Sequence, residues 1–87
     1  MFYVYILTDK KGNFYTGYTA DLKKRLVEHN RGKTFTTSKS KNWICIYYEA
    51  CIEESDARRR ERYLKTTQGH RMLKLRLKDY LFKRRAS

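Results

Sequence analysis

The N-terminal segment reads FYVYILTDKKGNFYTGYT over residues 2–19. Residues 2–7 form an unbroken run of apolar and aromatic side chains, and a polar stretch that contains Gly12 ends this run. Residues 14–19, rich in aromatic and β-branched side chains, follow at once. Two such runs joined by a short turn with glycine predict a β-hairpin.

A helix is predicted directly after the hairpin, over about Ala20 to Asn30. Its inward stripe has residues at i, i+3, i+4 and i+7, namely Leu22, Arg25, Leu26 and His29. Thr19 is expected to cap this helix, and residues 30–32 to stop it. The polar and basic stretch GKTFTTSKSK, residues 32–41, is a loop of the kind that often carries function.

A third strand is predicted over residues 43–49, and it is expected to be central because it is apolar on both faces. A second helix begins at Glu54 or Ser55 and is interrupted near residues 66–69. Residues 70–84 fit either a strand or a helix, and their length and composition favour a helix.

The fold class expected is therefore α/β of the α+β type, a small three-stranded antiparallel sheet flanked by helices. With 87 residues, no proline and no repeat or low-complexity linker, the chain is expected to be one domain over residues 1–87.

The charge is strongly positive, with 21 Lys and Arg against 9 Asp and Glu, a net charge of +12. This excess exceeds what solubility requires, so a polyanionic partner is expected, with nucleic acid ahead of an anionic membrane. The basic residues do not line one amphipathic helix, which argues against a membrane. Cys45 and Cys51 have no metal-site spacing and are expected to be structural. No signal peptide or long apolar run is present, so a cytoplasmic location is expected.

Five polar residues stand where the pattern predicts buried or half-buried positions: Tyr5, Tyr15, Arg25, His29 and Glu61. Each has an ordinary structural explanation. Arg25 could extend along the rim of the protein, and Glu61 could pair with a helical neighbour, Arg58 or Lys65. Taken together they are harder to explain, because buried charged groups are costly unless they are paired.

These residues carry a resemblance to a known family. Tyr3-Val4-Tyr5, Tyr15-Thr16-Gly17, the segment from Asp21 to Leu26 with His29-Asn30, and Glu61 within residues 57–65 together resemble the GIY-YIG nucleases. The likeness extends from residue 1 to about residue 81 and is strongest to small stand-alone bacterial members. Tyr3 stands for the first glycine of the signature and Thr16 for its second isoleucine, while the polar set is complete.

The resemblance implies a shallow site over the sheet that uses one divalent metal, Mg²⁺ or Mn²⁺, held by Glu61. In this interpretation Arg25 stabilises the charge on the scissile phosphate, and Tyr5 activates the water while Tyr15 positions the phosphate. His29 accepts the tyrosine proton or binds phosphate. Gly17, Tyr18, Lys39 and Lys41 are candidate substrate contacts.

The function expected is a Mg²⁺-dependent DNA endonuclease that is structure- or repair-directed, since no separate sequence-reading module is evident. Two alternatives remain: a nucleic-acid-binding module that cleaves poorly, and a nuclease subunit that needs a protein partner. A homodimer that cuts both strands is also compatible with the sequence. Composition does not separate these alternatives, because all of them would be basic.

Overall fold

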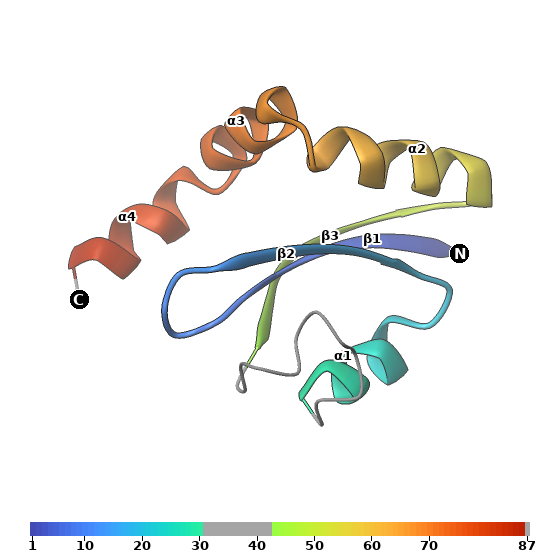
Figure 1. Ribbon diagram of the computed structural model, residues 1–87, viewed down its shortest axis with the longest axis horizontal. Helices are drawn as coiled ribbons and strands as arrows, with labels where there is room; N and C mark the ends of the chain where they lie inside the picture. The colour runs from blue at the N-terminus through green and yellow to red at the C-terminus, as the bar shows by residue number, and fades with distance from the viewer. Residues whose placement is uncertain (31–42, 87) are drawn as a thin grey trace.

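The structure is a computed structural model that describes residues 1–30 and 43–86. A three-stranded antiparallel sheet contains β1 (Phe2–Thr8), β2 (Phe14–Thr19) and β3 (Ile44–Cys51) in the order β2-β1-β3. Four helices accompany it: α1 (Leu22–Asn30), α2 (Glu54–Leu64), α3 (Thr67–Arg76) and α4 (Lys78–Ala86). Figure 1 shows α1 on one side of the sheet and α2 and α3 on the other. The predicted fold class is confirmed.

The central strand is β1, so the prediction that the third strand is central was wrong. Residues 4–8 of β1 are all buried, because β1 has a strand on either side and helices over both faces. β3 lies at an edge, where Ile44 and Tyr48 are about half exposed. Both runs are equally apolar in sequence, and only the pairing distinguishes them.

Alternate residues of β1 serve two separate cores. Val4 and Ile6 pack with Ala57, Leu64 and Leu73 beneath α2 and α3. The other face of the sheet carries Tyr5, Leu7 and Trp43, with Leu22 and Leu26 of α1 packed against them. The two-residue alternation of strand side chains produces this division.

The turn between β1 and β2 is held by Asp9. One carboxylate oxygen accepts from the backbone N–H groups of Lys11 (3.0 Å) and Asn13 (2.8 Å), and the other accepts from the Asn13 amide. Gly12 has a φ of 91°, a backbone conformation that residues other than glycine rarely adopt. The sequence prediction of a hairpin is therefore met by a well-defined turn.

Asp21, and not Thr19, caps α1. The Asp21 carboxylate accepts from the N–H of Lys24 at 3.2 Å, and Thr19 Oγ1 accepts from the N–H of Asp21 one step earlier. Both residues are good caps, and the helix begins at Leu22, one residue after Asp21. The predicted start was thus two residues too early.

The C-terminal region is helical, as predicted, but in two pieces. Thr66 caps α3 by accepting from the N–H of Gly69, and a Cβ on Gly69 would lie 2.1 Å from the carbonyl oxygen of Tyr63. Gly69 therefore permits α3 to turn closely against the end of α2. A second break, at Leu77, separates α3 from α4.

Candidate active site

Tyr5 lies at the centre of the candidate site. It is fully buried on the β1 face that α1 covers, and its partner on β2 is Gly17. A Cβ on Gly17 would lie 2.3 Å from both Cζ and the hydroxyl oxygen of Tyr5. The phenol therefore extends directly over Gly17, and the glycine is required by Tyr5 itself.

The Tyr5 hydroxyl meets His29 at the end of α1. Its oxygen lies 2.7 Å from Nε2 of His29, and both side chains are fully buried. Burial and the nearby Arg25 charge lower the pKa of His29, so the imidazole is neutral at pH 7. The sequence pattern placed His29 one helical turn from Arg25 but did not reveal this bond.

Burial raises the pKa of Tyr5 to about 12, although hydrogen bonding from Arg25 acts in the opposite direction. Arg25 can only donate, so it faces the phenol oxygen, and the hydroxyl proton is then directed to Nε2 of His29. A buried, protonated Tyr5 does not fit the expectation that this residue activates water. The protein environment favours the neutral phenol.

Tyr15 lies beside this pair and is only half-buried. Its ring centroid is 4.8 Å from that of His29 and 6.2 Å from that of Tyr5. Tyr15 and Gly17 share the α1 face of β2, since they pair with Leu7 and Tyr5 of β1. Of the two tyrosines, Tyr15 is the one that solvent can reach.

Arg25 is partly buried and borders the same cluster. Its pKa is raised chiefly by hydrogen bonding with Tyr5, and Glu28 lies 3.6 Å from its Nη1. Nε of Arg25 is buried and has no hydrogen-bond partner within residues 1–30 and 43–86. The guanidinium therefore retains donor capacity for a ligand.

Glu61 lies on α2, on the other side of the sheet from α1 (Figure 1). Its charge is near enough to raise the pKa of Tyr5, and its side chain is 20% exposed. It pairs with Lys65 at 3.2 Å, whereas Arg58 pairs with Glu54 instead. The predicted salt bridge with Lys65 is therefore present. A pair with an exposed lysine contributes little to stability, so Glu61 can exchange Lys65 for another cation.

Glu61 can hold a divalent cation only if waters and a substrate phosphate supply the other ligands. Across the part of the chain that the structure describes, no three His, Cys, Asp or Glu side chains gather to hold a metal. Mg²⁺ is commonly held by one or two carboxylates together with waters and substrate phosphates. Glu61 alone satisfies that requirement when a phosphate is bound.

One predicted substrate contact, Tyr18, is not brought to the cluster. Tyr18 lies on the opposite face of the sheet, where it donates to Glu54 and carries the guanidinium of Arg58 over its ring at 4.5 Å. Lys39 and Lys41 lie outside the described residues. Side chains alternate between the two faces of a strand, so the sequence already places Tyr18 on the opposite face of β2 from Tyr15 and Gly17.

Two residues that the sequence reasoning passed over complete the cluster. Trp43 is buried, and its ring centroid lies 6.4 Å from that of Tyr15. Asn30 holds the backbone of Trp43 in place. The Asn30 amide donates to the carbonyl of Trp43 at 3.1 Å and accepts from its N–H at 2.9 Å. Asn30 and Trp43 are thirteen positions apart, so no local sequence pattern predicts their contact.

None of the described helices is long and apolar enough to cross a lipid bilayer.

Comparison with known proteins shows the family to which the chain belongs. The model of the GIY-YIG catalytic domain matches residues 1–74. UPF0213 proteins of Staphylococcus saprophyticus and Staphylococcus haemolyticus are 35% and 36% identical over 74 residues, which is 84% of this chain and 90% of each relative. The solution structure of a UPF0213 protein from Bacillus halodurans is similar, with 32% identity and a TM-score of 0.53 over 84% of this chain and 82% of that one. The chain therefore belongs to the GIY-YIG nuclease family.

Proposed function

We propose that this protein is a metal-dependent endonuclease that hydrolyses phosphodiester bonds in DNA, directed to a DNA structure rather than to a sequence. The observation that carries the proposal is the joint placement of two tyrosines, Arg25 and His29 on one face, with the Glu61 charge acting on Tyr5. Hydrolysis requires a proton acceptor, a cation for the phosphate and a ligand for a metal. This set supplies all three.

Arg25 is proposed to bind the scissile phosphate. Its side chain is 35% exposed, and a guanidinium presents a planar fork of N–H donors that matches two phosphate oxygens. The charge that develops on these oxygens in the transition state would strengthen the same hydrogen bonds. Lys would not substitute for it, because an ammonium group lacks the fork.

Tyr15, rather than Tyr5, is proposed to act on the attacking water. Tyr15 is accessible, whereas Tyr5 is fully buried and has a pKa of about 12. The rings of Tyr5 and His29 lie against Tyr15, with centroids at 6.2 and 4.8 Å, and hold the Tyr15 ring in position. This assignment moves the water-activating role that the family resemblance suggested for Tyr5 to Tyr15.

Glu61 is proposed to hold Mg²⁺ or Mn²⁺ together with a phosphate oxygen and waters. When bound, such an ion neutralises charge on the phosphate and polarises its ligands. Lys65 would be displaced from the carboxylate and could then contact the DNA backbone. The DNA-repair role and the cytoplasmic location remain predictions of the same kind, as do a protein partner and a homodimer.

The proposal is tested by cleavage of supercoiled plasmid and of branched, flapped and linear oligonucleotides in Mg²⁺ or Mn²⁺. Wild type is expected to nick at least one of these, and Arg25→Ala to lose most of the activity while it remains folded. Activity that appears only when cell extract is added would support the subunit alternative. Tight binding of every substrate without cleavage in either metal would contradict the proposal and favour the binding module.

A further inference from the structure

A groove lies at the far end of the molecule from α1, between the β1–β2 turn and the last two helices. It encloses about 830 Å³ and is lined by Gly12, Asn13, Phe14, His70, Lys74, Lys78, Leu81, Phe82, Arg84 and Arg85. Four of these residues are Lys or Arg, and none is acidic. The groove is therefore complementary to a polyanion.

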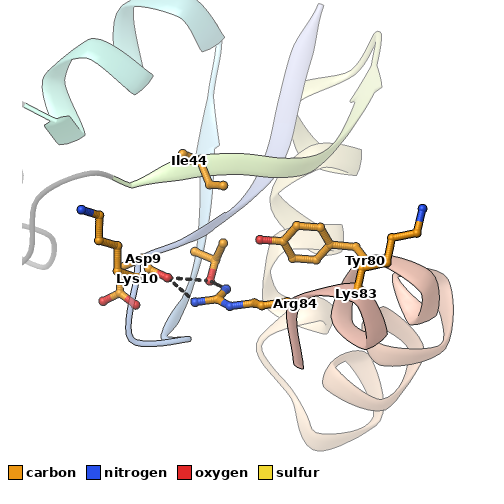
Figure 2. A pocket seen from close by; sticks show the side chains of 7 residues that line it. Asp9, Lys10, Ile44, Tyr80, Lys83 and Arg84 are labelled. Atoms are coloured by element: carbon orange, nitrogen blue, oxygen red, sulfur yellow. Dashed lines mark hydrogen bonds between the residues drawn. The ribbon is translucent and has the colours of Figure 1, made fainter. Parts of the chain in front are cut away.

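The position of α4 along this groove is fixed by Arg84. Its guanidinium donates to Oγ1 of Thr8 at 2.6 Å and to the backbone carbonyl of Asp9, both of which belong to buried residues at the end of β1. Figure 2 shows these bonds, with Tyr80 and Ile44 beside them in a second hollow that also has Lys10 and Lys83 in its lining. The anchored helix holds Lys78 and Arg85 in the groove wall.

An aromatic side chain stands among these cations. Phe82 is 71% exposed although it lines the groove, and Phe14 lies in the wall opposite on β2. An exposed Phe between phosphate-binding cations is the arrangement on which unpaired bases stack. Bases within a duplex are already stacked on one another, so a single strand fits this groove better.

The groove and the candidate active site lie on opposite faces of the sheet. Phe14, which lines the groove, packs with the core beneath α2 and α3, whereas the next residue of β2, Tyr15, packs on the face that α1 covers. β2 is an edge strand, so a DNA strand that contacts both sites has to pass around this edge of the sheet.

We propose that this groove binds a single-stranded segment of the DNA substrate, on the opposite face of the sheet from the candidate active site. The proposal rests on the proposed function and names its substrate class, a DNA with an unpaired arm. Lys74, Lys78 and Arg85 contact phosphates, and Phe82 stacks on a base. Residues 75–87 lie beyond the match to the catalytic domain, so α4 adds this contact to the nuclease core.

The test measures binding of a fluorescent oligothymidylate of about twelve nucleotides to the full chain in EDTA, by anisotropy over a range of salt concentrations. The double variant Lys74→Ala/Lys78→Ala is compared with Lys10→Ala/Lys83→Ala, which removes equal charge from the hollow on the other side of Arg84. Phe82→Ala is compared with Leu75→Ala, a similarly exposed apolar side chain on α3.

The groove double variant is expected to bind on the order of tenfold more weakly, with a salt slope smaller by about 1.4, since each phosphate contact to a single strand contributes about 0.7. Phe82→Ala is expected to lose between about fivefold and a hundredfold, as for one stacked base. Both control variants should bind nearly as wild type. Equal losses in the two double variants, or an unchanged Phe82→Ala, would overturn the proposal.

A blunt duplex of equal length serves as competitor, and displacement of the oligothymidylate at equal concentration would overturn the choice of a single strand. Cleavage is assayed separately on the same proteins. If the groove variants lose binding and wild type cleaves no DNA, the proposed nuclease activity is rejected, and the proposed single-strand binding in the groove stands. Cleavage by wild type, with groove variants that bind as wild type does, would reject the groove alone.

Discussion

Gly17 is the residue on which the geometry of the cluster depends most directly. Gly17→Ala would place a methyl group 2.3 Å from the Tyr5 ring, so the phenol must move and its bond to His29 must lengthen. We expect the free energy of unfolding to fall by about 1–3 kcal/mol, the range for overpacked sites. Urea denaturation measures this loss.

The same substitution in a Tyr5→Leu background provides the control, because the shorter side chain leaves room for the added methyl group. The two changes should then be coupled, with Gly17→Ala costing less when Tyr5 is absent. Equal costs in both backgrounds would mean that Gly17 is needed for another reason.

The two tyrosines should respond differently to loss of the hydroxyl group. Tyr5→Phe leaves Nε2 of buried His29 without this partner and is expected to lower the free energy of unfolding by about 1–3 kcal/mol. Tyr15→Phe should hardly change stability, since Tyr15 is half-buried, but should lower the cleavage rate more at saturating DNA. The opposite pattern, a stable Tyr5→Phe with the larger catalytic loss, would restore Tyr5 as the base.

His29 gives stability a dependence on pH. Burial lowers the pKa of His29 in the folded protein, so below about pH 6.5 the unfolded chain binds the proton more readily. The contribution of His29 is therefore complete above about pH 6.5 and is lost as the pH falls through the folded-state pKa. Thermal melting between about pH 7.5 and 5.5 should show declining stability in wild type.

His29→Gln should flatten this decline, whereas His70→Gln, at an exposed position, should retain it. A decline of the same size in His29→Gln would assign the acid sensitivity to other groups. The comparison is between slopes, so it remains informative even if His29→Gln is less stable throughout.

Arg84 of α4 makes two hydrogen bonds to the end of the central strand. Arg84 joins α4 to the end of β1, and Arg84→Ala removes both of these hydrogen bonds. We expect amide hydrogen exchange over residues 78–85 to become faster while residues 54–64 of α2 keep their protection. Lys83→Ala, one residue earlier, is the matched control, and equal effects of the two variants would contradict the anchoring role.

The elements also mark how far sequence reasoning could go. The hairpin, α1 and α2 follow from local periodicity, and the inward stripe predicted that Arg25 and His29 would face the sheet. The strand order did not follow, because β1 and β3 are equally apolar and only long-range pairing makes β1 central. The cap at Asp21 and the break at Leu77 were not predicted. Thr19 and Asp21 are both suitable caps, and no residue near Leu77 is a strong helix breaker.

For the whole molecule, the two faces of the sheet have different tasks. The α1 face holds the tyrosines and His29, and the α2 face holds the larger aliphatic core. Arg60 ties α2 to β3 by donating to both carboxylate oxygens of Glu49, at 2.9 and 3.0 Å. That bond and the contact of α2 with β1 fix the position of α2, the helix that carries Glu61.

The grouping of Tyr5, Tyr15 and His29 on one face could be predicted from sequence, whereas the different burial of the two tyrosines could not. Burial separates Tyr5 from Tyr15, and a strand pattern assigns both to the same face. Tyr18 shows the converse, because simple alternation already excluded it from that face. The groove beside α4 requires residues from the turn, α3 and α4 to come together, which no local pattern predicts.

The central claim is that Glu61, with Arg25 and the tyrosines, forms one phosphodiesterase centre. The most direct measurement is the single-turnover rate of cleavage of the preferred branched DNA in Mg²⁺ by wild type, Glu61→Gln and Glu53→Gln. Glu53 is an exposed carboxylate at the start of the same helix and makes no side-chain cap. The account predicts a rate lower by about 10² or more for folded Glu61→Gln and an unchanged rate for Glu53→Gln. Equal rates for all three proteins would contradict it.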